Sequence, residues 1–213
     1  MTGNQTMDAA QEITNSEDLR ERYGEPGERA VLKQIDHIDA HCRAFISLSP
    51  FLVIGTQGAD GLGDVSPKGD APGFVLVSDE KTLVIPDRPG NNRTDTLLNL
   101  LDNPGVGLIF LVPGMNETLR VNGNARIVTD AAVLEAMLVN DRPPRSAIVV
   151  DVKEAYLHCA KALIRSKLWS DTHKIERKTF PSLGQIITDQ IGRGDDVAEA
   201  DKSIDESYRT KLY

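Results

Sequence analysis

Short alternating runs of hydrophobic and polar residues fill the middle of the chain, which is the pattern of half-buried β-strands. The runs are rich in β-branched residues and are bounded by glycine, asparagine, aspartate and proline. They predict strands in FLVIGTQ (51–57), DVSPKGDAPG (64–73), FVLVSDEKTLVIPD (74–87), VGLIFLVPG (106–114), TLRVNGNARIV (118–128) and SAIVVDVKEAYLHCA (146–160). Because short turns join most of these runs, we expect an antiparallel sheet.

A helical spacing of apolar residues precedes the strands. In ERAVLKQIDHIDAHCRAFISLSP (28–50), apolar residues recur at intervals of four, three and four. This spacing places Val31, Ile35, Ile38 and Cys42 on one stripe. The segment is therefore predicted to contain one long helix that covers other apolar elements.

Two shorter helices are predicted between strands. The first, near 93–101, is expected to begin at Asn92 as its N-cap and to end at Asn103. Its apolar face is expected to consist of Leu97, Leu98 and Leu101. The second lies in TDAAVLEAMLV (129–139) and has a capping threonine or aspartate at its start.

The number and order of these elements indicate the fold class. About six strands with a few helices between or outside them predict a mainly β fold, in the form of a closed or partly closed antiparallel barrel. The chain has no regular alternation of strand and helix, which argues against a doubly wound parallel sheet. The glycine-rich GADGLG (58–63) is interpreted as a hairpin turn, since it lacks the helix that follows a dinucleotide-binding loop.

Composition limits the domain number and the partners. The chain has 213 residues, 40% of them hydrophobic, which is enough for one core. Its 32 acidic and 24 basic side chains favour a small-molecule partner and give no electrostatic reason to expect nucleic acid or a membrane surface. One domain is predicted over 28–192, with an N-terminal extension over 1–27. The charged C-terminal tail, 193–213, is expected to be mobile or to lie on a partner chain.

Targeting and redox features favour a cytoplasmic protein. The first thirty residues lack the regions of a signal peptide, and no apolar run approaches the roughly 20 residues that span a bilayer. Cys42 and Cys159 lie far apart and are interpreted as reduced, buried thiols. His37 and His41 have the spacing of a metal-binding pair, but no third ligand is evident, so no metal site is predicted.

The segment PDRPGNNR (86–93) carries the first candidate site. Arg88 and Arg93 lie where a strand ends and a helix begins. A helix N-terminus has unsatisfied N–H groups and a partial positive charge, and guanidinium groups match the geometry of a phosphate. These features indicate a phosphomonoester site. The alternative is an exposed turn whose arginines pair with Asp87 and Asp95.

A polar strand, DVSPKGDAPGF (64–74), favours the phosphate interpretation. Ser66, Pro67, Lys68 and Asp70 interrupt an otherwise apolar set of strands, which suits a surface that meets a ligand. The lysine could hold the anionic edge of a ring.

Three motifs in this order resemble a known family. VSPKGDAPGF (65–74), LVIPDRPGNNRTDTLLNLLDNPGVGLIFLVPG (83–114) followed by ETLRVNGNARI (117–127), and HCAKALIRSKLW (158–169) are similar to the pyridoxamine phosphate oxidase-like superfamily of FMN-binding split barrels. They resemble most closely its branch of probable FMN-dependent enzymes of undefined substrate. The resemblance extends from about residue 28 to about residue 190. It implies a six-stranded antiparallel split β-barrel that forms a homodimer, with one FMN in each of two clefts between the subunits.

The resemblance also implies three groups of cofactor-binding residues. The isoalloxazine ring is expected to lie along Val65, Ser66, Pro67 and Lys68. The ribityl and phosphate groups are expected at Ile85, Pro86, Asp87, Arg88, Asn91, Asn92 and Arg93, with Arg88, Asn92 and Arg93 as phosphate ligands. The cleft is expected to be closed from the partner subunit by Lys161, Arg165, Ser166 and Trp169.

The implied function is that of an FMN-dependent oxidoreductase acting on a small organic molecule. Lys68 near the N1–O2 edge of the ring would stabilise the anionic reduced flavin, and no catalytic residue is assigned. The segment after Trp169 lacks the arginine-x-histidine motif of pyridoxamine phosphate oxidases, which argues against that substrate. NAD(P)H is left open as the reductant. The alternatives are a non-catalytic flavin-binding or redox-responsive carrier module, and a relative that uses a deazaflavin or haem.

Overall fold

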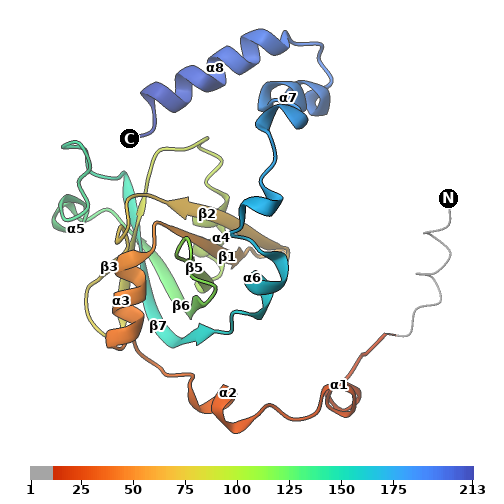
Figure 1. The fold of residues 1–213 in the computed structure, drawn as a ribbon. Coiled ribbons are helices and arrows are strands. Elements are labelled where there is room, and N and C mark those ends of the chain that lie inside the picture. Colours follow the sequence, from red (N-terminus) through yellow and green to blue (C-terminus); the bar gives the residue numbers. More distant parts are fainter. Residues whose placement is uncertain (1–11) are drawn as a thin grey trace, which may run out of the picture. The chain divides into compact units, whose positions relative to one another are not determined.

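The computed structural model describes residues 12–213 and divides the chain into two compact units between Gln34 and Ile35. In the described part of the first unit there are two short helices, α1 (Ser16–Tyr23) and α2 (Glu28–Leu32). The second unit holds every strand and all other helices that residues 12–213 form (Figure 1). The predicted boundaries of the domain, 28 and 192, stay predictions.

All strands of the second unit belong to one antiparallel sheet of order β2-β1-β5-β6-β7-β4-β3. The strands are β1 (Phe51–Gln57), β2 (Gly63–Gly69), β3 (Leu76–Val77), β4 (Thr82–Asp87), β5 (Gly105–Leu111), β6 (Thr118–Val128) and β7 (Ser146–His158). The mainly β antiparallel fold with flanking helices is therefore confirmed. The strand count was wrong, because there are seven strands, and the sheet is not closed: β2 and β3 stand at its two edges.

The predicted long helix over 28–50 is wrong. Its first half contains only α2, and α3 (Ala40–Leu48) begins at Asp39, whose carboxylate accepts the N–H of Cys42 at 2.7 Å. Between them Ile35 exchanges main-chain hydrogen bonds with Ala155 of β7, at 3.1 and 2.7 Å. This pairing needs an extended residue, so the chain cannot stay helical there.

The other flanking helices follow or precede individual strands. They are α4 (Asp95–Asp102), α5 (Ala131–Glu135), α6 (Lys161–Ser166), α7 (Leu183–Ile191) and α8 (Val197–Thr210), with 3₁₀ turns at Asp171–His173 and Arg177–Thr179. The helix predicted in 129–139 is confirmed as α5, and Asp130 is its N-cap. None of the described helices is long and apolar enough to cross a membrane.

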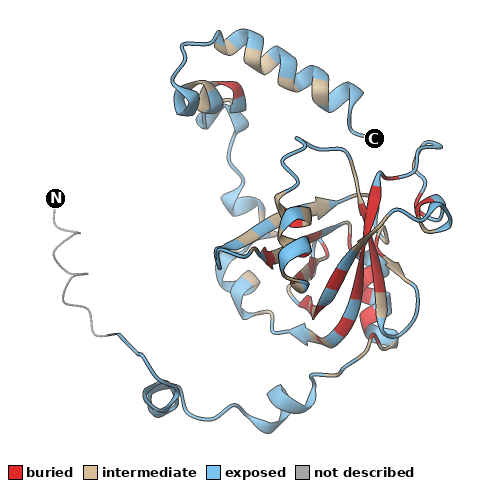
Figure 2. Cartoon of the chain, turned by 180° about the vertical axis from the view of Figure 1, so that it is seen from behind, coloured by how far each residue is buried: buried red, intermediate tan, exposed pale blue. Residues whose placement is uncertain are grey.

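The main core lies between the inner face of the curled sheet and helices α3 and α4. Figure 2 shows buried residues concentrated in the central strands. Phe110 of β5, Leu119 of β6 and Ile148 of β7 are fully buried there, and Ile46 of α3 packs in the same cluster. Each such side chain contributes about 1.5–3 kcal/mol of hydrophobic stabilisation. The sheet is therefore stabilised by contacts between strands that are distant in sequence.

The two cysteines have different environments. Cys42 is buried in the core, and burial raises the pKa of its thiol to about 12. Cys159 is exposed at the end of β7. The prediction of two buried thiols is therefore wrong for Cys159, because β7 ends at the residue before it.

The predicted C-terminal tail contains helix α8, and its mobility or contact with a partner chain stays a prediction. Asp196 caps α8 by accepting the N–H groups of Ala198 and Glu199. α8 packs against α7, where the N–H of Gly184 donates to Asp201 at 2.9 Å. A side chain at residue 184 would collide with Asp201, so glycine permits this close approach.

We predict that Gly123→Ala destabilises the sheet. Gly123 lies at a register shift between β6 and β7, and an added Cβ would collide with the main-chain oxygen of Asp151. The free energy of unfolding in urea should fall by about 3 kcal/mol, the upper range for overpacking. Gly63→Ala in β2 is the matched control, because a Cβ there meets nothing within 4 Å. Equal stability of the two variants would contradict the packing.

Candidate functional site

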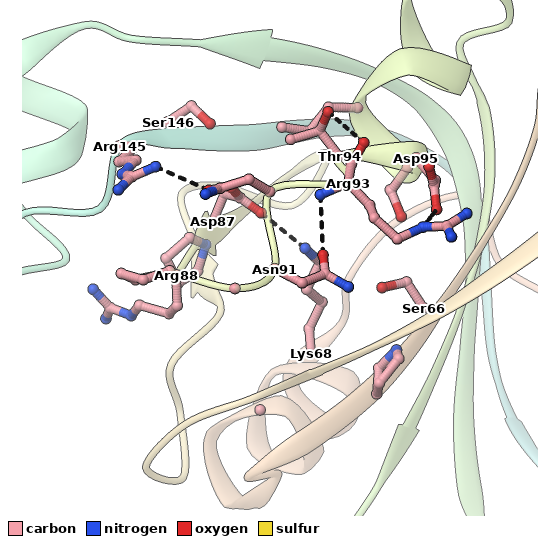
Figure 3. Close-up of a pocket in the computed structure, with 18 of the residues that line it drawn as sticks. Ser66, Lys68, Asp87, Arg88, Asn91, Arg93, Thr94, Asp95, Arg145 and Ser146 are labelled. Atoms are coloured by element: carbon pink, nitrogen blue, oxygen red, sulfur yellow. Dashed lines mark hydrogen bonds and ion pairs between the residues drawn. The ribbon is translucent and has the colours of Figure 1, made fainter. Parts of the chain in front are cut away.

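A cavity of about 640 Å³ opens between strand β2, the end of β4 and the start of α4 (Figure 3). Its wall contains most of the residues that the sequence assigned to the cofactor. They are Val65, Ser66, Pro67, Lys68, Pro86, Asp87, Arg88, Asn91, Asn92 and Arg93. Two motifs that are separate in sequence therefore line one cavity.

Strand β2 supplies one wall as the edge strand of the sheet. It pairs only with β1, so Pro67 is tolerated although it has no N–H to donate. Ser66 and Lys68 share the more buried face of β2, and Val65 and Pro67 share the exposed face. Because successive side chains of a strand point to opposite faces, the residues predicted to contact the ring are divided between the two faces of β2.

A salt bridge joins the two walls of the cavity. Nζ of Lys68 on β2 lies 2.8 Å from Oδ1 of Asp87 at the end of β4. Both side chains are largely buried. The ammonium of Lys68 keeps two further N–H donors, so it can still donate to a ligand in the cavity.

A second, more buried ion pair holds Arg88. Its Nε lies 2.8 Å from Oδ2 of Asp70, and the side chains are 15% and 3% exposed. Burial alone raises the pKa of Asp70, but hydrogen bonds from the N–H of Ala71, the hydroxyl of Tyr213 and Arg88 together lower that pKa below its ordinary value. Asp70 is therefore ionised at neutral pH and keeps Arg88 in place. Because the Nε of Arg88 makes this bond, its Nη groups remain as donors for an anion.

The loop between β4 and α4 has an unusual backbone. Asn92 and Thr94 have φ angles of 60° and 58°, in the left-handed region that asparagine tolerates better than most residues. Thr94, not Asn92, is the N-cap of α4, and its side chain makes no capping bond. The predicted cap was therefore wrong. First-turn N–H groups of α4 without a side-chain cap are suited to an anion.

The predicted apolar face of α4 is wrong for Leu98 and Leu101 but correct for Leu97, which is half-buried against the core. Leu98 and Leu101 are exposed, whereas Thr96 and Leu100 are buried. Nδ2 of Asn99 donates to Oγ1 of Thr56 at 3.0 Å, which fastens α4 to β1 and orients its N-terminus toward the cavity.

The cations are spread along the loop rather than gathered at one point. Figure 3 shows Arg88 and Arg145 on one side of the cavity and the guanidinium of Arg93 on the other, beside Asp95. Arg93 pairs with Asp95 at 2.8 Å as the exposed-turn alternative expected, but Arg88 pairs with Asp70 and not with Asp87. The exposed-turn alternative is therefore confirmed for Arg93 and wrong for Arg88, and phosphate binding by this segment stays a prediction.

Sequence reasoning missed Arg145 and Ser146 in the cavity wall. Arg145 donates to Oδ1 of Asn92 at 3.2 Å, and among the described residues no carboxylate pairs with it. The missed residues include Asp64, Gly69, Phe74, Pro89, Gly90, Thr94, Asp95, Thr96 and Leu97. No local signal marks Arg145, because it reaches the cavity only through the pairing of β7 with β4.

Five predicted residues lie elsewhere in the same chain. Ile85 is fully buried in the core and does not line the cavity. The other four lie on α6 or just after it, namely Lys161, Arg165, Ser166 and Trp169. Nε1 of Trp169 donates to the main-chain oxygen of Met115 at 2.6 Å, which attaches this segment to the loop before β6. Their contact with a partner's cofactor stays a prediction.

The family model described as pyridoxamine 5'-phosphate oxidase matches residues 38–159. The chain belongs to the pyridoxamine 5'-phosphate oxidase family. The match includes every strand of the described residues and the whole wall of the cavity, but not helices α1, α2 and α6–α8.

Several solved structures are similar to this family member. HupZ of Group A Streptococcus is 20% identical, with 56% of this chain and 93% of that chain covered and a TM-score of 0.47. A putative pyridoxamine 5'-phosphate oxidase from Lactobacillus delbrueckii is 18% identical, with 57% and 95% covered and a TM-score of 0.45. The FAD binding protein from Mycobacterium smegmatis is 17% identical, with 57% and 96% covered and a TM-score of 0.39. Comparison with curated proteins gives no match.

We predict that two of the ion pairs at the cavity, Arg88–Asp70 and Arg93–Asp95, differ in their contribution to stability. Arg88→Ala should lower the free energy of unfolding by about 3 kcal/mol, because it leaves the buried carboxylate of Asp70 without its cation. Arg93→Ala is the control and should change stability little, because its pair with Asp95 is exposed. Urea denaturation at neutral pH measures both. A larger loss of stability in Arg93→Ala than in Arg88→Ala would contradict the burial of the Arg88–Asp70 pair.

The same pair should show a defined pH dependence. Since the folded-state pKa of Asp70 lies below its ordinary value, the stabilisation is present above about pH 4. It is lost as the pH falls through the lowered pKa, when the carboxylate takes up a proton. The stability difference between the native chain and Arg88→Ala should therefore shrink in acid.

Proposed function

We propose that the chain is an FMN-binding flavoprotein that acts as an oxidoreductase on a small organic molecule. The observation that carries the proposal is the cavity itself, in which an edge strand faces guanidinium groups from the loop between β4 and α4 and from the residue before β7. Membership of the pyridoxamine 5'-phosphate oxidase family supports it.

The cavity is suited to a mononucleotide with a phosphate at one end. Its volume of about 640 Å³ lies within the roughly 300–1,000 Å³ of ordinary cofactor sites. Arg88 and Arg145 from one side of the cavity, and Arg93 with the N–H groups that begin α4 from the other, would hold the phosphate between them. Residues 65–68 of β2 would lie along the isoalloxazine ring.

The protein's own groups would bind and orient rather than react. FMN, when bound, supplies hydride and electron transfer. Lys68 would donate to the edge of the ring while Asp87 holds its ammonium in place. Because Asp87 shares the charge of Lys68, the lysine would stabilise negative charge on the ring less than an unpaired ammonium.

The test is flavin binding by purified protein. We predict that the chain binds FMN more tightly than riboflavin, because only FMN has the phosphate that the arginines would meet. In a double variant, Arg93→Ala and Arg145→Ala, FMN affinity should fall about 100-fold, the product of two lost charge-assisted hydrogen bonds. Riboflavin affinity should stay the same. Flavin fluorescence quenching measures both ligands.

The control is Arg126→Ala, which removes an exposed guanidinium on β6 outside the cavity wall. This variant should bind FMN like the native chain. A native chain that binds neither flavin would overturn the proposal. FMN affinity that the double variant retains would overturn the assignment of the phosphate end.

We further propose that the chain is a homodimer in which α6 of one subunit reaches the cavity of the other. Support comes from exposed apolar side chains near the cavity, since Leu62 and Val65 are each 72% exposed. Arg165 and Trp169 are the residues that would approach the partner's cofactor.

We predict a mass near twice the 23.3 kDa of one chain in sedimentation equilibrium. Arg165→Ala should weaken FMN binding and leave the dimer intact, because the residue is exposed on α6. Lys167→Ala, also exposed and outside the predicted set, is the matched control. If the chain is a monomer and its FMN affinity does not depend on Arg165, the proposal of a cofactor site shared between subunits is overturned.

A further inference from the structure

Tyr213 contacts the ion pair that holds Arg88, although it is far from it in sequence. The hydroxyl of Tyr213 donates to Oδ1 of Asp70 at 2.9 Å. The guanidinium carbon of Arg88 lies 5.8 Å from the centroid of the tyrosine ring, within the range of a cation–π contact. One side chain therefore touches both members of the pair.

A second contact fixes Tyr213 from another loop. Nη1 of Arg142 donates to the main-chain oxygen of Tyr213 at 2.9 Å. Arg142 lies in the segment that leads to Arg145, which lines the cavity on the same side as Arg88 (Figure 3). Tyr213 thus connects the loop after β2 with the loop before β7. Asp70 on the first loop pairs with Arg88, and the second loop contains Arg145.

The carboxylate of Asp70 links Tyr213 to Arg88, because it accepts a hydrogen bond from each of them. Its Oδ2 accepts from Arg88, while its Oδ1 accepts from Tyr213 and from the N–H of Ala71. With both oxygens occupied and the side chain almost fully buried, the carboxylate has one orientation. That orientation decides where the guanidinium of Arg88 lies.

We propose that Tyr213 is a positioning residue that holds the Asp70–Arg88 pair in the geometry with which Arg88 meets an anion in the cavity. The inference rests on the proposed function for the identity of the anion, the phosphate of FMN. Tyr213 lies outside residues 38–159, so the family match does not assign it any role.

The test compares Tyr213→Phe with the native chain by isothermal titration, using FMN and, separately, inorganic phosphate. The variant keeps the ring over Arg88 and removes only the hydroxyl. Both ligands should bind about fivefold more weakly, the order expected from the loss of one hydrogen bond to a charged group. Tyr208→Phe is the matched control and should bind like the native chain, because Tyr208 is exposed on α8, the helix that ends shortly before Tyr213.

The outcomes separate this inference from the proposed function. Equal binding by Tyr213→Phe and the native chain would overturn the inference and leave the proposed function standing. A native chain that binds phosphate but not FMN would overturn the proposed function, and the phosphate affinities would then decide the inference. Binding of neither ligand would overturn both.

A spectroscopic measurement tests the contact itself. The hydrogen bond to Asp70 raises the pKa of the Tyr213 phenol, with burial and the negative charge of Asp70 acting in the same direction and Arg88 opposing them. The absorbance difference at alkaline pH between the native chain and Tyr213→Phe should therefore titrate above the ordinary tyrosine value of about 10. Titration at the ordinary value would show that Tyr213 does not hold Asp70 and would overturn the inference.

Discussion

Strand β7 pairs on both of its edges while it buries most of its side chains, and the site depends on this constraint. It forms ladders with β6 and with β4, and Ile148 and Val150 on it are fully buried. Its register with β4 ends where Asp87 lies opposite Ser146. Arg88 directly follows β4, and Arg145 directly precedes β7. Two guanidinium groups therefore reach one side of the cavity because apolar strands pair in a single register.

Most of the cavity's cations are held by carboxylates of the same chain. Lys68 pairs with Asp87 and Arg88 pairs with Asp70, so their donors have fixed positions. An anion that enters the cavity meets groups that need little rearrangement, which favours binding although the whole chain carries a net charge of −8. Arg145 adds a guanidinium without a carboxylate partner among the described residues. Local geometry, more than overall charge, thus supports the proposed binding of a phosphate.

The family match and the C-terminal segment contribute different parts of the site. Residues 38–159 form the sheet and the whole cavity wall. Tyr213 lies outside the matched residues, and its hydroxyl donates a hydrogen bond to Oδ1 of Asp70. Residues outside the family match can therefore support the proposed anion site, because they can complete a buried carboxylate's set of donors.

The strands, their antiparallel arrangement and the two motifs of the cavity were determined by the sequence itself, because alternation of polarity, turn residues and charge are local properties. Other features depended on contacts between distant segments. Ile35 is extended because it bonds Ala155, and Arg145 reaches the cavity because β7 pairs with β4. Tyr213 contacts Asp70 although 143 positions separate them. Burial and hydrogen bonding across the fold decide such pairings, and these exist only once the chain has folded.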